Sequence, residues 1–570
     1  STILKNKQDE LKNDFSNQWL NLSRMCRKSE SLFRAEMFCS RARYSATSPE
    51  VCNYEFAKIA YAKNKKDQAI SLIKSIQEQI SKKIELKESQ SLLSNDELHE
   101  LFGKFIYTRA KWSEEVNSED SSAIISMYLK SAELQESKDK IKSDSEAVRN
   151  SILGAAKAYF SLGALEDQKA TSYIQHLTET NEMTQKKAPR PGKFWRQLTP
   201  TEMREFFYSR LTGALDNYLK CIIYSPQYSY EVVPRILFLF FDYGRYFIVG
   251  DEEKKIPNMS SNQKKDVFDS MKESMLKVEK VKVGVWLNSI NQLISRIDQP
   301  KTLDEILYKL IKLSVLEYPE STLWYLIPIK HSTVANRKPK WEKLMEYIKR
   351  NLPKDFLTKL IKYTDNLASV AQNIIDLCSS NPGSSKSRVI KASSLCPKLA
   401  SSLKDCRVLM PLLSTLTANL DSPSSQSSNS KIEIIEMGTS IYLFSSLQKP
   451  KKVKFYASNG TSYHYLCKKD EDLRKDMRMM EFATFINRIL TNDRLCRQKD
   501  FRMVTYAVIC LNETCGILEW VENTKSFRKV VGKMLDFRGI KIDYEEIRKL
   551  YIDVERPNKE QIKLKMSNFQ

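Results

Sequence analysis

The sequence predicts a mostly α chain, in which a helical solenoid is followed by a smaller α+β lobe with an antiparallel sheet. Glycine, which sheets and tight turns use, occurs only 14 times in 570 residues. Amphipathic helical patterns run through residues 1–330, whereas the pattern after residue 430 alternates with the period of a strand. Because 570 residues exceed what one hydrophobic core supports, several domains or a repeat array are expected.

The composition narrows the class of protein. Hydrophobic residues make up 41% of the chain, which is enough for packed cores. No stretch approaches the roughly 18 continuous apolar residues of a transmembrane helix. The formal net charge of +22 is compatible with nucleic acid, an acidic protein or an anionic membrane as partner. The lysines are dispersed along polar helix faces, so a solvated helix surface and a basic groove are both open explanations.

The 11 cysteines do not predict a metal site. No C-x-x-C pair occurs, and Cys26, Cys39 and Cys52 have no histidine cluster beside them, although zinc sites need close, paired ligands. Scattered cysteines in a lysine-rich chain are typical of reduced thiols in a cytosolic or nuclear protein. The first residues, S-T-I-L-K-N-K, lack the form of a signal peptide and are typical of an internal cut.

A loose repeat of about fifty residues organises the first part of the chain. A small residue followed by an aromatic recurs in three segments: Ala57, Ala60 and Tyr61; Ala110 and Trp112; Ala155, Ala158 and Tyr159. Alanine lets paired helices approach closely and the aromatic fills the space in the next pair, as in tetratricopeptide-like arrays. An ordinary helical domain with chance alanines is the alternative.

Polar, serine-rich or proline-containing stretches predict loops at 186–192, 379–387 and 422–430. One or two short helices are expected over residues 389–420. The resulting division is helical repeats over 1–335, a helical bundle or insertion over 336–430, the α+β lobe over 431–521, and the start of a further lobe over 522–570.

A β-hairpin is expected in the α+β lobe. Alternating runs at 451–457 and 462–467 flank Asn459 and Gly460. An Asn-Gly pair between such runs predicts a type I′ turn, in which both central residues have positive φ.

The second strand of this hairpin ends at Lys468, and a helix is expected over 473–490. Asp476 lies one turn into that helix, where its carboxylate can hold the lysine. A lysine held in this way and directed at phosphate is an electrostatic clamp for phosphoryl transfer. A solvated lysine beside a charged helix start is the alternative.

Two further strands complete the expected lobe, at 501–511 and 516–521, with a turn at 512–515. The end of the last strand can offer backbone donors and acceptors to an adenine edge, with Trp520 stacking on the base. The chain contains no G-x-G-x-x-G and no G-x-x-x-x-G-K-[ST], so phosphate contact is expected from the serine- and lysine-bearing turn 445–452.

These segments resemble the phosphatidylinositol 3-kinase-related protein kinases, and their sequences are similar to the ATR type of checkpoint kinase from a fungus. The resemblance rests on S-S-L-Q-K-P-K-K (445–452), L-C-K-K-D-E-D-L-R-K-D-M-R-M-M-E-F (466–482) and T-Y-A-V-I-C-L-N-E-T-C-G-I-L-E-W-V-E-N-T (505–524). Upstream, residues 234–244 and 286–300 resemble the helical FAT region that precedes these kinases. The implied architecture is a FAT-type, TPR-like α-solenoid followed by a kinase N-lobe and the start of the C-lobe.

The resemblance assigns roles to single residues. Lys468 resembles the lysine that contacts the ATP phosphates, Asp476 the carboxylate that pairs with it, and Glu471 a nearby acidic residue of the same pocket. Tyr506 is expected to line the adenine pocket. The remaining positions are those of the phosphate-binding turn, Ser445 and Ser446, and of the hinge, Glu519, Trp520 and Val521.

One motif of the family is absent. Its catalytic loop carries Asp-Arg-His, followed by a metal-binding Asp-Phe, but none of the histidines, His99, His176, His331 and His464, follows Asp-Arg. We therefore expect no catalytic residue and no metal ligand in this chain, which should be inactive alone because positioning and metal ions supply most of the catalysis.

The resemblance also implies a function for the full-length protein. From the resemblance we expect a nuclear serine/threonine kinase that uses ATP with Mg²⁺, signals DNA damage and replication stress, and phosphorylates Ser/Thr-Gln sites. The implied partners are an ATRIP-like regulatory subunit, a second copy in a dimer of heterodimers, and protein-coated single-stranded DNA, with no membrane. A non-catalytic helical scaffold with a basic surface for nucleic acid or acidic proteins is one alternative, and a lipid kinase of the same superfamily is another.

Overall fold

The structure is a computed structural model that describes residues 2–45, 49–85, 95–136, 146–183, 198–251, 254, 256, 259–350, 352–381, 387–420, 431–445, 448–540 and 545. Two compact units make up the chain, Ser1–Leu518 and Glu519–Gln570. The predicted loops at 186–192 and 422–430 lie outside the described residues, and the loop at 379–387 lies partly outside them.

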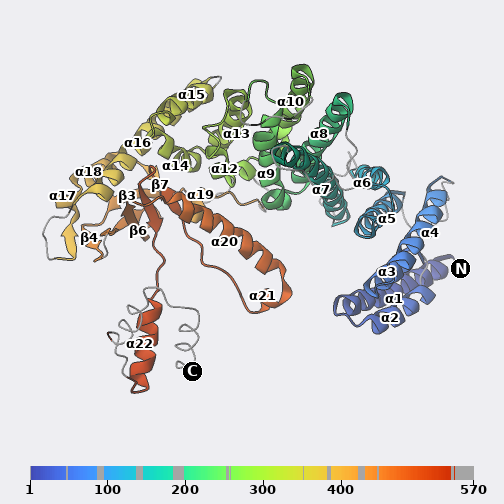
Figure 1. Cartoon of the computed structure of the whole chain (residues 1–570). Helices are drawn as coiled ribbons and strands as arrows, with labels where there is room; N and C mark the ends of the chain where they lie inside the picture. The colour runs from blue at the N-terminus through green and yellow to red at the C-terminus, as the bar shows by residue number, and fades with distance from the viewer. Residues whose placement is uncertain are drawn as a thin grey trace, which may run out of the picture. The chain divides into compact units, whose positions relative to one another are not determined.

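Antiparallel helices form the first part of the first unit (Figure 1). They are α1 (Thr2–Lys28), α2 (Leu32–Ser45), α3 (Pro49–Ala62), α4 (Lys66–Glu85), α5 (Asn95–Val116), α6 (Ser121–Gln135), α7 (Glu146–Met183) and α8 (Pro200–Tyr224). Successive helices pack on one another, as the helical pattern of the sequence predicts.

The predicted repeat appears as a ladder of contacts between α3, α5 and α7. Hydrogen bonds join residues 54 positions apart in three pairs: Tyr54–Thr108, Tyr107–Ser161 and Tyr61–Glu115. Tyr61 also stacks on Trp112, with ring centroids 4.2 Å apart and an interplanar angle of 6°. Ala57, Ala110 and Ala155 are fully buried. The predicted burial of the alanines is confirmed for these three positions, whereas Ala60 is half-buried, and Tyr61 packs against the next helix pair as predicted.

Further helices continue the first unit. They are α9 (Ser229–Phe238), a π-helical turn (Leu239–Tyr243), α10 (Ser261–Leu276), α11 (Gly284–Leu287), α12 (Ile290–Ile294), α13 (Asp304–Glu317), α14 (Pro319–Lys330), α15 (Arg337–Lys349) and α16 (Lys354–Ser379), which is the longest of them. Trp286 and Trp324 are completely buried among them. One hydrophobic cluster runs from Ala132 to Ile517, whereas smaller, separate clusters pack most of the helices before it.

An antiparallel sheet forms the α+β lobe that the sequence predicts. Its strands are β1 (Val389–Lys391), β2 (Val408–Leu409), β3 (Glu433–Met437), β4 (Ser440–Leu443), β5 (Lys451–Ala457), β6 (Ser462–Lys469), β7 (Val508–Cys510) and β8 (Cys515–Glu519). The order is β1-β4-β5-β6-β8-β7, with β3 pairing both β2 and β5.

The segment between α16 and β3 holds more structure than the one or two helices predicted for 389–420. It contains three short helices, α17 (Ala392–Leu395), α18 (Pro397–Asp405) and α19 (Leu413–Leu416), and the strands β1 and β2. Since β1 pairs with β4 and β2 with β3, the sheet includes residues upstream of position 431. Strands of two or three residues give too short an alternation to be recognised in the sequence.

The hairpin of β5 and β6 forms where predicted, but its turn type differs. Gly460 has a φ of +76°, whereas Asn459 is not among the residues with positive φ, so the turn is not type I′. The Gly460 amide donates to the Ala457 carbonyl (3.0 Å), and the Ala457 amide donates to the Thr461 carbonyl (3.0 Å). This pattern is a tight turn followed by one left-handed residue, which glycine adopts without steric cost.

Helix α20 (Arg474–Asn492) follows the hairpin as predicted, and α21 (Arg494–Gln498) follows it. The strand predicted over 501–511 is wrong for residues 501–507, because only Val508–Cys510 is extended and paired. The segment before β7 instead lies along α20. Asn487 holds it there, donating to the Met503 carbonyl (2.8 Å) and accepting from the Met503 amide (2.6 Å).

The second unit begins at Glu519 and contains α22 (Phe527–Phe537). Ser526 caps the N-terminus of this helix, because its hydroxyl accepts a hydrogen bond from the Lys529 amide (3.4 Å). Throughout the chain the cysteines are free thiols and most of them are buried. In the part of the chain that the structure describes, no helix combines the length and apolar character that crossing a membrane requires.

A buried carboxylate ties α7 to α8 and α9. Asp167, whose side chain is 5% exposed, accepts two hydrogen bonds from the Arg235 guanidinium (2.6 and 2.8 Å) and one from the Tyr218 hydroxyl (3.0 Å). Arg235→Met should lower the free energy of unfolding of this region by about 2 kcal/mol, since it leaves a buried charge without its cation while the 39% exposure of Arg235 reduces the loss.

Urea denaturation measures the effect, and Arg350→Met is the matched control. Arg350 pairs with Glu346 on the surface, where both side chains are more than 60% exposed, at 67% and 65%. The control should change the free energy by no more than about 0.5 kcal/mol. Equal effects of the two substitutions would contradict a stabilising role for the ion pair between Asp167 and Arg235.

Candidate functional site

Lys468 lies near the end of β6, and its ammonium pairs with Glu471. The distance from Nζ to Oε2 is 2.8 Å, and the two side chains are 24% and 31% exposed. Asp470 makes the reversal between them with a φ of +56°. An ammonium has three N–H donors and Glu471 accepts from one of them, so the group has the capacity to bind phosphate as well.

Asp476, the predicted partner of Lys468, lies in the first turn of α20 and is half-buried. The ion pair that the structure records for Lys468 is with Glu471 rather than with Asp476. Asp472 accepts hydrogen bonds from the Arg474 amide (3.2 Å) and guanidinium (2.7 and 2.8 Å), and the guanidinium lowers the pKa of this carboxyl group. These bonds fix the start of α20 directly after the lysine.

The turn between β4 and β5 places less positive charge near Lys468 than the predicted phosphate-binding turn at 445–452 would. Ser445 is exposed just after β4, whereas Ser446 lies outside the described residues. Lys451 is only 2% exposed and donates to the Cys378 carbonyl (2.8 Å), and burial lowers the pKa of this lysine. As the first inward-facing residue of β5, it belongs to the core and not to a phosphate-binding turn.

Tyr506 and the predicted hinge residues lie around β7 and β8. Tyr506 packs with the small cluster formed by residues such as Leu473 and Met477, on the side of β7 that faces α20. Glu519 is the last residue of β8, and Trp520 and Val521 follow it at the beginning of the second unit.

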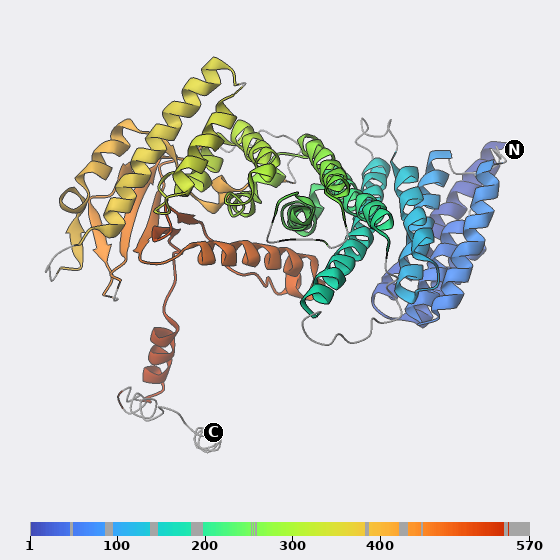
Figure 2. The same cartoon turned by 45° about the horizontal axis from the view of Figure 1, so that its top comes forward.

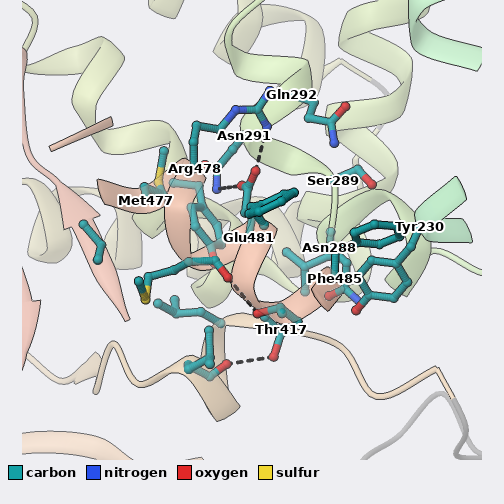
Figure 3. Close-up of a pocket in the computed structure, with 18 of the residues that line it drawn as sticks. Tyr230, Asn288, Ser289, Asn291, Gln292, Thr417, Met477, Arg478, Glu481 and Phe485 are labelled. Atoms are coloured by element: carbon teal, nitrogen blue, oxygen red, sulfur yellow. Dashed lines mark hydrogen bonds and ion pairs between the residues drawn. The ribbon is translucent and has the colours of Figure 1, made fainter. Parts of the chain in front are cut away.

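Helix α20 also contacts the helices α8 to α16, which we call the helical segment. The sequence did not predict this contact (Figure 3). Glu481 accepts hydrogen bonds from the Asn291 amide of α12 (2.7 Å) and from Arg478 (2.6 Å). Arg488 donates to the Gln227 carbonyl (2.6 Å) and lies over the Tyr230 ring, 4.7 Å from its centroid. Figure 2 shows α20 passing along these helices.

Glu513, at the turn between β7 and β8, makes a second contact with the helical segment. Its carboxylate accepts from the Ser332 hydroxyl (2.5 Å), the Thr333 amide (2.9 Å) and Arg337 (3.2 Å). Burial raises the pKa of Glu513, but the hydrogen bonds from Ser332 and Thr333 outweigh burial and leave the pKa below its usual value. Polar residues like these give no periodic signal in a sequence, and only their partners reveal them.

Comparison with known protein families shows to which family the chain belongs. Sequence models match three stretches: "FAT domain" over residues 1–238, "Serine/threonine-protein kinase ATR-like, HEAT repeats" over 267–368, and "Phosphatidylinositol 3- and 4-kinase" over 462–569. The chain belongs to the phosphatidylinositol 3-kinase-related kinases. The last match contains Lys468, Glu471 and α20.

Curated relatives within this family are ATR-like kinases. The chain is 27% identical to "Serine/threonine-protein kinase ATR" of Oryza sativa subsp. indica over 445 residues, which are 75% of the chain and 15% of the relative. It is 27% identical to "Protein kinase rad3" of Schizosaccharomyces pombe (62% and 15%) and 24% identical to "Serine/threonine-protein kinase MEC1" of Kluyveromyces lactis (94% and 21%). The chain thus spans between 15% and 21% of these relatives.

Two solved structures share the fold of this chain. The structure "Complete CtTel1 dimer with C2 symmetry" matches with a TM-score of 0.69 at 16% identity, over 95% of this chain and 19% of that one. "FAT and kinase domain of CtTel1" matches with a TM-score of 0.64 at 15% identity, over 95% and 36%. The predicted order, a FAT-type helical region followed by a kinase N-lobe, is confirmed.

The contact made by Glu513 should weaken in acid. Because the folded-state pKa of Glu513 lies below the usual value of 4.5, its carboxylate stabilises the contact above pH 4.5, and this stabilisation is lost as the pH falls through the lower, folded-state pKa. Glu513→Gln should produce the same loosening at neutral pH. Hydrogen exchange at the Thr333 amide reports it directly, because this amide donates to the Glu513 carboxylate.

Glu342→Gln, on the exposed side of α15, is the control and should leave exchange at Thr333 unchanged. Slow exchange at Thr333 in the Glu513→Gln protein would show that the carboxylate does not hold the turn.

Proposed function

We propose that this chain is the FAT region and the ATP-facing small lobe of a serine/threonine protein kinase of the ATR type. The observation that carries the proposal is the position of Lys468, near the end of β6 and beside the start of α20, within the stretch that matches the kinase family. A strand-borne lysine fixed by a carboxylate, here Glu471, supports phosphate contact and positioning, which dominate phosphoryl transfer.

We propose that the lobe holds a nucleotide. ATP, when bound, supplies the phosphoryl group, and Mg²⁺ neutralises charge on its phosphates. Lys468 would contact the phosphates, with Ser445 and Ser446 in the turn beside them. Tyr506, Glu519, Trp520 and Val521 are the candidates for the adenine side. Among the residues that the structure describes, no cluster of His, Cys, Asp and Glu side chains resembles a metal site, and we assign no Mg²⁺ ligand to this chain.

Similarity to ATR, rad3 and MEC1 supports a protein kinase of the same type. We propose that the full-length protein signals DNA damage and replication stress by phosphorylating Ser or Thr followed by Gln. We further propose a nuclear protein that works with an ATRIP-like subunit in a dimer of heterodimers and reaches single-stranded DNA through the proteins that coat it. These proposals concern the full-length protein, of which the chain corresponds to a part.

Lys468→Ala in the full-length kinase should lower kcat for phosphorylation of a Ser-Gln peptide by about 100-fold or more, as expected when one electrostatic contact to the transition state is removed. Folding should be unaffected, because the side chain is partly exposed at the end of a strand. Peptide phosphorylation measured across a range of ATP concentrations separates kcat from the KM for ATP.

Lys469→Ala is the matched control. Lys469 is the next residue of β6, points to the opposite face, and pairs loosely with Asp470 (3.7 Å). Activity should remain within about twofold of wild type, by the small energy of an exposed pair. Wild-type turnover in the Lys468→Ala protein would reject the assignment of Lys468.

A further inference from the structure

Helix α20 has little hydrophobic core of its own. Of its 19 residues, Ala483 alone is buried. Met477 and Met480 pack partly against β7 and β8, and Glu481 and Arg488 make hydrogen bonds to the helical segment. A helix with so few buried side chains gains little stability from packing, so its position depends on what lies beside it.

A cavity of about 450 Å³ lies between α20 and the helical segment. It is bounded by α9, α11, α12, α14 and α19 together with α20 and β7. This volume is within the usual range for small-molecule sites, roughly 300 to 1,000 Å³. All of the lining belongs to the first unit.

The lining has an apolar part and a polar part. Tyr230, Tyr325 and Phe485 supply aromatic surface, and Met477 and Met480 supply thioether surface. Aromatic rings and thioethers pack favourably against another ring.

The polar part contains neutral amides: Asn288, Asn291 and Gln292 come from the α11–α12 region (Figure 3). The charged lining residues are Arg478 and Glu481, which neutralise each other at 2.6 Å. With its cation already paired, the cavity disfavours phosphates and other anions, and amides favour a neutral hydrogen-bonding group.

We propose that this cavity is a regulatory binding site for an uncharged aromatic molecule that carries an amide or hydroxyl group. Its ring would lie among Tyr230, Phe485 and the methionines, and its polar group would reach the side-chain amide of Gln292 or the second N–H of the Asn291 amide, because Asn288 is already bonded to the Ala418 backbone. Such a ligand contacts α20 and the helical segment at once. It therefore supplies the apolar contacts that α20 lacks and fixes the helix that follows Lys468.

The effect on turnover rests on the proposed kinase function, whereas binding does not. Because α20 begins six residues after Lys468 and carries Asp476 in its first turn, a ligand that fixes α20 changes the geometry around the nucleotide phosphates. Occupancy should then alter the KM for ATP.

Binding is tested with the full-length kinase by saturation-transfer NMR, with benzamide as the uncharged probe and benzoate as its anionic counterpart. Benzamide should give a signal that persists in saturating ADP, which blocks the nucleotide site, and benzoate should give a weaker one. Ser289→Trp, which fills the cavity, should abolish the benzamide signal. Ser401→Trp, on the exposed face of α18, should leave it intact.

Thr484→Phe fills the cavity from α20 and replaces Ser289→Trp if that variant unfolds. No benzamide signal in the wild type, a signal displaced by ADP, or a signal that survives a folded cavity-filling variant would overturn the site. For regulation, benzamide should change the KM for ATP at least twofold in the wild type and not in the filled variant. An unchanged KM with binding intact rejects regulation, while an inactive wild type rejects the proposed kinase function and leaves the binding result standing.

Discussion

The placement of α20 by polar contacts is the constraint on which the candidate site depends. The sheet fixes Lys468, but α20 packs weakly on the sheet, and its outer side is held by the Glu481–Asn291 hydrogen bond and by Arg488. Such contacts are directional and have low net energy, since each replaces a hydrogen bond to water. The helical segment therefore contributes more to the geometry of the α+β lobe than to its stability.

The contact of Glu513 has the same character at the other end of the lobe. Its carboxylate receives hydrogen bonds from a hydroxyl, a backbone amide and a guanidinium, which satisfy most of its acceptor capacity. Together with α20 it joins the lobe to α12, α14 and α15 at separate points. A lobe held at separate points has less rotational freedom than one held by a single linker.

The sequence predicts the parts of this fold that repeat or alternate. The alanine and aromatic positions around Tyr61 and Trp112 identify the helical array, and the runs around Gly460 identify the hairpin, because burial imposes a period on each. The strands β1 and β2 are too short to show a period. The turn at Gly460 has only one left-handed residue. The register of the two strands determines this turn type, and the composition of the turn does not reveal it.

The site was predictable only where a motif fixes a residue by its place along a strand. Lys468 is such a residue, and its position near the end of β6 agrees with the sequence. Its carboxylate partner is Glu471, because the positive φ of Asp470 turns the chain back within three residues, and a pattern of charges does not reveal that reversal. Lys451, drawn into the core by the alternation of β5, shows that charge alone does not mark a phosphate contact.

The separation of hydrophobic clusters described above has a consequence for cooperativity. Most of the helices before residue 132 pack in small clusters of their own, whereas a single cluster runs from Ala132 into the sheet at Ile517. Segments that share no core open independently, and segments that share one open together. The first repeats are thus able to unfold and refold independently of one another, while the later helices and the α+β lobe unfold together because they share one core.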